Sequence, residues 1–133
     1  MEDVFELAYR YVVPSIRNTL VRELVKKGIP RNSVASLLNL SRSAVSRYMS
    51  DERGMFIQMA RFKDVHNMIE KLADEIIQRR NDEYMVQERI SMIAAYFLSR
   101  KYFCVEHKKI NPKLDAVKCK VCKNVFSMLS GNA

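Results

Sequence analysis

The chain has 133 residues, of which 48% are hydrophobic and 29% charged, the balance of a folded globular protein rather than a disordered one. It contains three glycines and three prolines, a scarcity that favours long helices with few sharp turns. No stretch approaches the ~20 apolar residues of a membrane span. The opening sequence MEDVFELAYR is acidic and lacks the layout of a signal peptide. We therefore expect a cytoplasmic protein without a membrane partner.

The positive charge is unevenly distributed along the chain. The net charge is +8, with +2 in residues 31–53, −1 in residues 54–99 and +6 in residues 100–133. A basic surface suggests a polyanionic partner, either nucleic acid or an anionic membrane face. The alternative is that the charge only keeps the protein in solution.

Apolar residues recur at helical spacing through the first 30 residues. They predict a short helix over residues 4–11. Pro14 suits the first turn of a second helix, where its missing N–H has no cost. The stripe from Ile16 to Val25 ends at Gly28, a residue typical of a helix C-cap.

Two short helices with a tight turn between them are predicted next. The first covers about residues 33–38, with Asn32 as its N-cap. Asn39 tolerates the left-handed conformation that a tight turn needs. Ser41 is placed to cap the second helix, over about residues 42–49.

The middle of the chain reads as a loop followed by helices. Asp51 to Gly54 has loop composition, and the apolar residues at 56–60 suggest a short helix. A longer helix is expected over residues 64–80, and another over about residues 83–101. Either Asn81 or Asp82 can cap the last of these helices.

The fold class predicted is all-α, and the pattern favours three regions. These are a helix-turn-helix domain over residues 1–62, a helical dimerisation region over residues 63–101 and a basic metal-binding tail over residues 102–133. A small hairpin over residues 116–126 is the one place where strands are conceivable.

The segment from Asn32 to Ser50 has the pattern of a helix-turn-helix. Ala35 is small where the two helices would approach most closely, and Tyr48 is expected in the core. The second helix offers short hydroxyl groups and guanidinium groups, the types that read base edges in the major groove, on Arg42, Ser43, Ser46 and Arg47. Arg31 and Asn32 are expected near phosphates, together with the first N–H groups of their helix. A helical hairpin that binds nothing is the alternative.

Several runs within residues 4–60 resemble a family of archaeal predicted transcriptional regulators. These runs are 11–17 (YVVPSIR), 24–28 (LVKKG), 34–38 (VASLL) and 44–48 (AVSRY). The resemblance implies a Cro or phage-repressor type domain of about five helices. It also implies that Ser41, Arg42, Ser43, Ser46 and Arg47 face DNA. The family usually has glycine in the turn, where this chain has Asn39.

The cysteines cluster in the tail in a metal-ligand pattern. They form Cys104-x-x-His107 and Cys119-x-x-Cys122, two pairs of soft ligands with two-residue spacers. A closed structural zinc site is the leading interpretation. An iron–sulfur cluster or a metal-free tail with a redox-active Cys119/Cys122 pair is the alternative. A similar C-terminal pattern recurs in the archaeal regulators named above.

Two further features of the sequence have open interpretations. Six tail lysines either offset thiolate charge or contact DNA phosphates: Lys108, Lys109, Lys113, Lys118, Lys120 and Lys123. His66 is expected at the surface or at its boundary. Five methionines are ordinary core residues or part of a dimer interface between the two long helices: Met55, Met59, Met68, Met85 and Met92.

The function expected is that of a dimeric transcription regulator that binds specific double-stranded DNA and carries a tail that is stabilised by a metal or that senses a metal or the redox state. The alternative is a zinc-knuckle module for protein interaction, with the helix-turn-helix as scaffold. Enzymatic activity is not expected, because four ligands already fill a tetrahedron and Glu106 is the one acid between paired ligands. No small-molecule substrate is evident.

Overall fold

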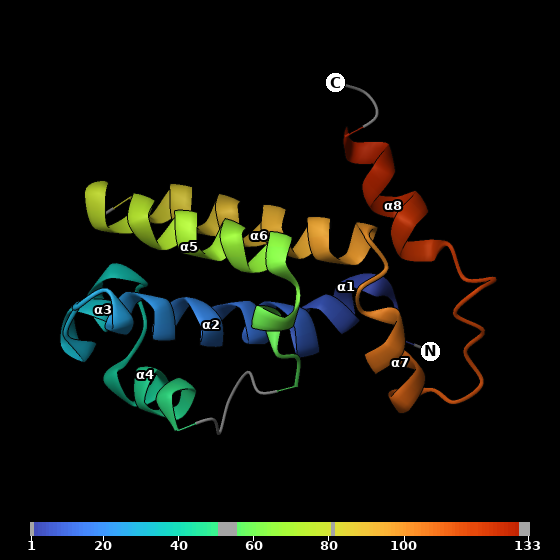
Figure 1. The fold of residues 1–133 in the computed structure, drawn as a ribbon, viewed down its shortest axis with the longest axis horizontal. Helices are drawn as coiled ribbons and strands as arrows, with labels where there is room; N and C mark the ends of the chain where they lie inside the picture. Colours follow the sequence, from blue (N-terminus) through green and yellow to red (C-terminus); the bar gives the residue numbers. More distant parts are fainter. Residues whose placement is uncertain (1, 51–55, 81, 131–133) are drawn as a thin grey trace.

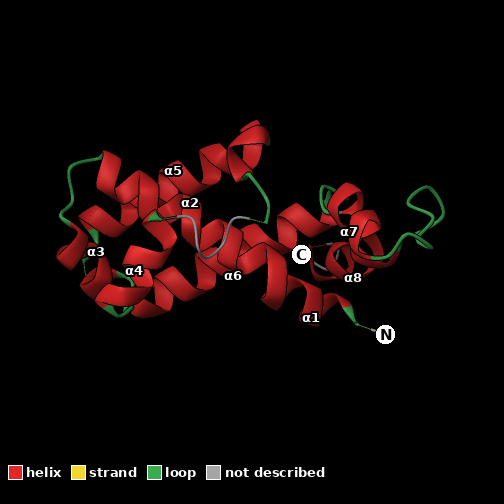
Figure 2. Cartoon of the chain, turned by 90° about the horizontal axis from the view of Figure 1, so that it is seen from below, coloured by secondary structure: helices red, strands yellow, loops and turns green. Residues whose placement is uncertain are grey.

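The structure, a computed structural model, describes residues 2–50, 56–80 and 82–130. Within these residues every regular element is a helix and no strand occurs, so the all-α fold class is confirmed (Figures 1 and 2). The predicted loop from Asp51 to Gly54, the candidate core residue Met55 and the candidate cap Asn81 lie outside the described residues. No helix in the described part of the chain combines the length and the apolar composition needed to cross a membrane.

The N-terminal helices form one unbroken helical run. It consists of α1 (Val4–Leu7), a π-helical turn η1 (Ala8–Val12) and α2 (Val13–Lys26). Pro14 lies in the first turn of α2 as predicted, but no loop precedes it. The N–H of Val13 reaches back to the carbonyl of Ala8, five residues earlier. A π turn next to a proline accommodates its missing donor without ending the helix.

Two short helices follow, α3 (Arg31–Leu37) and α4 (Arg42–Met49). Gly28 ends α2 with φ of 93°, as the sequence predicts. Asn32 does not cap α3. Pro30 occupies the N-cap position, because its carbonyl accepts the first helical bond from the N–H of Val34 at 3.0 Å.

Two long helices cover one side of α2. The short 3-10 turn η2 (Met59–Arg61) leads into α5 (Lys63–Gln78), and α6 (Glu83–Ser99) returns beside it. Asp82 caps α6, since its carboxylate accepts from the N–H of Met85 at 3.0 Å. Figure 1 shows α5 and α6 on one side of α2 and α4 on the other.

The core runs between α2, α5 and α6. Its largest fully buried side chains include Ile16, Leu20, Leu24, Met59, Ile69, Leu72 and Phe97. Met59 and Met85 are buried, which confirms a core role for these two methionines, whereas Met92 on α6 is 54% exposed.

The tail contains two helices rather than a hairpin. These are α7 (Cys104–Ile110) and α8 (Val121–Ser130). The predicted hairpin over residues 116–126 is wrong, because Cys122, Val125 and Phe126 recur at helical spacing and turn one face toward the core. Phe126 meets Phe5 of α1 edge to face, with ring centroids 6.2 Å apart. The tail is thereby attached to the N-terminal end of the helical run.

Candidate nucleic-acid interface

The helix α4 separates its side chains into a buried and an exposed face. Ala44, Val45 and Tyr48 are buried, Tyr48 at 2% exposure, which confirms its predicted core position. The predicted DNA-facing residues of this segment are all exposed: Ser41, Arg42, Ser43, Ser46 and Arg47. The buried and the exposed residues lie on opposite faces of one helix. Packing of the buried face therefore fixes the direction in which the polar side chains point.

The turn before α4 has the geometry that the sequence predicts. Asn39 adopts a φ of 53°. The N–H of Leu40 donates to the carbonyl of Ala35 at 2.8 Å, and the N–H of Asn39 donates to that of Ser36 at 3.3 Å. This pair of bonds is a Schellman motif with asparagine at the left-handed position.

Ser41 caps α4. Its hydroxyl accepts from the N–H of Ala44 at 3.1 Å and lies 3.2 Å from the hydroxyl of Ser43. The turn and the cap together set the direction in which α4 leaves α3.

A polar clamp from α2 holds the other end of α4, and we call Asn18 and Arg22 the clamp. The Asn18 amide, on a residue 5% exposed, donates to the carbonyl of Tyr48 at 3.0 Å. Arg22 donates to the carbonyl of Met49 at 3.1 Å and to the Asn18 side chain at 3.0 Å. The last carbonyls of a helix have no hydrogen-bond donor within the helix, and the clamp supplies donors to those of α4.

Sequence reasoning missed the clamp. Its residues lie about 30 positions from the helix they hold. The one available signal was a pair of polar residues spaced four apart, at 18 and 22, within the apolar stripe of α2.

A hollow of about 330 Å³ opens beside α4. It is lined by Arg31 from the start of α3 and by Ser46, Arg47, Met49 and Ser50. The structure thus brings Arg31 together with Arg47, two cations that the sequence assigned to different roles. Asn32 is exposed on α3 but does not line this hollow.

The four predicted metal ligands line one cavity in the tail. This cavity, of about 680 Å³, is walled by α1, the end of α6, α7 and α8, and it includes Cys104, His107, Cys119 and Cys122. No three of their ligand atoms, all on described residues, lie within 4.8 Å of one another. The structure therefore brings the set to one place but not to coordination distance.

The thiols in this cavity influence one another. Burial raises the pKa of Cys122 to about 11, and the nearby Cys104 and Cys119 add to that rise. Burial also raises the pKa of Cys104. The thiolate forms of these three cysteines would repel one another. Together with the imidazole of His107, the three sulfur atoms form a soft donor set of the kind that binds zinc or an iron–sulfur cluster.

A second cluster of ligand-type side chains lies between α2 and α5. His66 contacts Glu23 through Nε2 at 3.2 Å and Glu70 through Nδ1 at 3.4 Å. The sequence placed His66 at the surface boundary, and its side chain is 24% exposed. Each ring nitrogen faces its own carboxylate, so the imidazole connects α2 to α5.

No protein-family model, curated protein or solved structure matches this chain. The resemblance to archaeal regulators therefore stays a prediction from the sequence.

Proposed function

We propose that this protein is a transcription regulator that binds specific sites on double-stranded DNA through α4. One observation carries the proposal. The helix α4 is fixed by buried residues on one face and presents Arg42, Ser43, Ser46 and Arg47 to solvent on the other. An α-helix is about 10–12 Å across with its side chains, the width of the B-DNA major groove.

The chemistry of the exposed set suits base readout. Arginine can donate two parallel hydrogen bonds to the O6 and N7 acceptors of guanine, and serine hydroxyls can donate or accept at any base edge. No acidic side chain lies on α4 to repel the duplex.

The hollow beside α4 suits a backbone phosphate. Arg31 and Arg47 both line it, together with the hydroxyl-bearing Ser46 and Ser50. Arginine and serine are typical phosphate partners in protein–DNA complexes, and such contacts fix register rather than sequence. Arg31 is therefore assigned mainly to positioning, and Asn32, exposed one residue on, stays a candidate for the same role.

The proposed tail site is a metal centre, zinc first and an iron–sulfur cluster as the alternative. Cys104, His107, Cys119 and Cys122 would hold the metal once their side chains converge across the cavity. A closed zinc site supplies cross-links rather than reaction chemistry. It would join α7 to the first turn of α8 and to the residues just before that helix. One zinc per chain by elemental analysis, without visible absorbance, supports this assignment; a brown protein favours the cluster.

The test of DNA binding is selection of duplexes from a random pool, followed by titration of single variants. Arg47→Ala should weaken binding to the selected site far more than to random duplex, by about 1–3 kcal/mol. Arg31→Ala should weaken both about equally. Lys71→Ala on α5 is the matched control, because it removes one exposed cation from the far side of α2. A wild-type protein that binds no duplex even at low salt would refute the proposal.

A second candidate function has one observation in its favour. The tail exposes several large apolar side chains: Val105 at 69%, Val117 at 84%, Val121 at 56% and Met128 at 65%. Scattered exposed apolar residues are common, but a group of four on one tail suits a protein partner. This would be the zinc-knuckle interaction module. It predicts that a tagged wild-type chain retains a partner protein that is lost when Val121 is replaced by lysine.

A further inference from the structure

The tail presents a basic surface on α7 and on the segment that follows it. Its cations are all exposed: Lys108, Lys109, Lys113, Lys118 and Lys120. The two acids of the tail offset two of these five charges and leave a net charge of +3. Glu106 forms an ion pair with Lys109 at 3.3 Å, and the Asp115 carboxylate accepts from the backbone N–H groups of Val117 and Lys118. We call the five lysines the basic tail surface.

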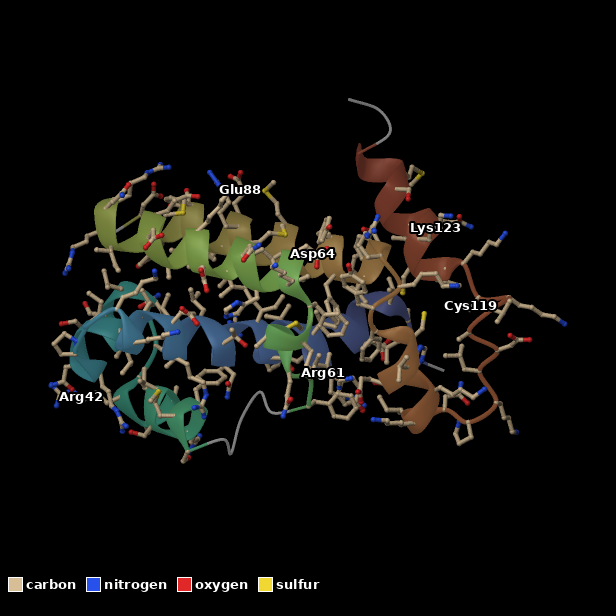
Figure 3. The ribbon with its side chains drawn as sticks, in the orientation of Figure 1. Arg42, Arg61, Asp64, Glu88, Cys119 and Lys123 are labelled. Carbon is tan, nitrogen blue, oxygen red and sulfur yellow. The ribbon has the colours of Figure 1, made fainter. Side chains whose placement is uncertain are left out.

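This surface and α4 lie at opposite ends of the molecule. Figure 1 shows α4 near one end of the long axis, with α7 and the following segment at the other, and both helices below α2 and α1. Figure 3 places Arg42 at the first end and Arg61 between the two ends, both on the lower edge, and Cys119 at the second end, higher in the view. Arg61 is exposed on η2.

The two long helices α5 and α6 lie on the other side and are acidic. Together they carry six acids and three bases, a net charge of −3. Figure 3 shows Glu88 projecting from that upper side, away from α4. A polyanion along the lower edge would meet cations at both ends and would not meet the face that carries Glu88.

The helical run from Val4 to Lys26 keeps the two ends apart. The clamp holds α4 toward the C-terminal part of this run. The tail packs at its N-terminal part, through Phe5 and through Tyr11, whose ring lies 6.0 Å from that of Phe103. The residues that anchor α4 and those that anchor the tail are 7 to 17 positions apart on the run, or roughly 10–26 Å at 1.5 Å per residue.

We propose that the basic tail surface is a second DNA contact, which binds backbone phosphates beyond the groove occupied by α4. The inference rests on the proposed function and extends it. The tail supplies affinity without sequence preference, because lysine contacts to phosphate carry no base information. Arg61 lies between the two contacts and meets the intervening backbone.

The experiment compares two triple variants on two duplexes, with each protein's metal content checked first. Lys108, Lys113 and Lys118 are replaced by glutamine in the first variant, and Lys63, Lys71 and Arg80 in the matched control. All six side chains are exposed and both variants lose three charges. The control set lies on α5 and just beyond it. One duplex of about 14 base pairs contains only the selected site, and the other extends it by about 20 base pairs on both sides.

The wild type and the control should bind the long duplex at least tenfold more tightly than the short one. The tail variant should lose this gain, and the slope of log K against log salt on the long duplex should fall by about 2.7, or 0.9 per lost phosphate contact. If the tail variant keeps the full length effect, the inference is overturned. A length effect from a second copy of α4 would survive in the tail variant, which separates the two causes.

The remaining outcomes are also decisive. If Arg47→Ala leaves sequence preference unchanged while the tail variant loses affinity, the proposed function fails and the tail contact stands. If vesicles with about one third anionic lipid bind the wild type more tightly than the long duplex does, and the tail variant loses that binding, the surface fits a membrane instead and the inference is overturned.

Discussion

At the scale of single residues, Asn39 is the position where the backbone sets the strictest requirement. Its φ of 53° lies in the left-handed region, which costs most side chains about 1–2 kcal/mol. Asparagine tolerates this region better than other non-glycine residues. Asn39 is exposed, so its replacement tests backbone conformation with little change in packing.

We expect Asn39→Ala to lower the free energy of unfolding by about 1 kcal/mol, because alanine has no favourable left-handed conformation. Asn39→Gly should leave stability unchanged or raise it slightly. Urea unfolding of the three proteins measures the difference. Ser36→Ala, at an exposed helical position on α3, serves as the control and should change stability by less than about 0.5 kcal/mol. Equal stability of the alanine and glycine variants would contradict the assigned turn.

Asp64 joins the start of α5 to the end of α6 and predicts an acid-dependent stability. Its carboxylate accepts from the hydroxyls of Tyr96 at 2.6 Å and Tyr102 at 2.8 Å. Burial works against ionisation, but these hydroxyls and the N–H of Val65 outweigh it and lower the pKa of Asp64. A lowered pKa in the folded state means that the stabilisation is complete above the ordinary value of 3.8 and disappears as the pH falls below it.

The stability of the wild type should therefore fall between about pH 5 and pH 2 more steeply than that of Asp64→Asn. Urea unfolding at a series of pH values measures both slopes. Asp74→Asn, on the same helix with a more exposed carboxylate, is the control and should keep most of the wild-type slope. Parallel curves for wild type and Asp64→Asn would show that the hydroxyl contacts do not favour the carboxylate.

Single-residue expectations succeeded where the cause is local. Gly28 and Asn39 were predicted from the left-handed conformation, and Ser41 from its capping hydroxyl, and each has the expected geometry. The cap assigned to Asn32 was wrong because Pro30 already supplies the first helical carbonyl. Competing caps two residues apart differ by small energies, which a sequence pattern does not resolve.

At the scale of elements, the clamp decides how firmly α4 is held. Asn18 is 5% exposed and donates to a carbonyl at the end of α4. Removal of its amide leaves the buried carbonyl of Tyr48 with fewer hydrogen-bond donors, which should lower the free energy of unfolding by about 1–3 kcal/mol. Asn18→Ala should therefore lower stability and speed amide hydrogen exchange in α4 more than in α5 or α6.

The affinity of Asn18→Ala for a selected duplex should fall, although the residue lies on the buried side of α2. Thr19→Ala provides a comparison on the next residue, since the Thr19 hydroxyl donates within its own helix, to Ser15. It should leave exchange in α4 and DNA affinity close to wild type. Uniform acceleration of exchange across all helices would assign the clamp to general stability rather than to α4.

A helix could be predicted from the sequence where its apolar residues recur at helical spacing along its own length. The stripes of α2, α5 and α6 gave helices within a few residues of their observed ends. The π turn over η1 and the helix α8 were missed. A π turn depends on one backbone hydrogen bond, which leaves no pattern in the sequence. The helix α8 is short, so the apolar residues around Val125 fit the spacing of a helix and that of a strand equally well.

At the scale of the whole molecule, the packing between residues far apart in the chain could not be predicted from the sequence. The pattern of cysteines and histidine predicted one metal site, and folding brings all four residues to one cavity. It did not predict that α1 forms a wall of that cavity, or that His66 bridges two helices. Such contacts join residues more than 40 positions apart, and no local period encodes them.

The predicted homodimer is the remaining proposal at this scale, and α6 offers it a surface. Tyr84 is 85% exposed and Met92 54% exposed, four residues on either side of Glu88. Residues four apart share one helix face. The side chain of Glu88 projects outward from the layer of α5 and α6, opposite α4 (Figure 3). A second copy that packs here leaves both α4 helices free for DNA.

We expect Met92→Glu to weaken dimerisation by at least about tenfold without unfolding the chain, since the side chain is exposed in the monomer. Glu88→Gln should strengthen it, because a residue near the centre of a two-fold contact faces its own copy and two carboxylates there repel. Sedimentation equilibrium measures both constants. Met128→Glu, at an exposed position on α8, is the control and should leave dimerisation unchanged. A wild type that stays monomeric at high concentration would refute the homodimer, and equal constants for Met92→Glu and Met128→Glu would move the interface away from α6.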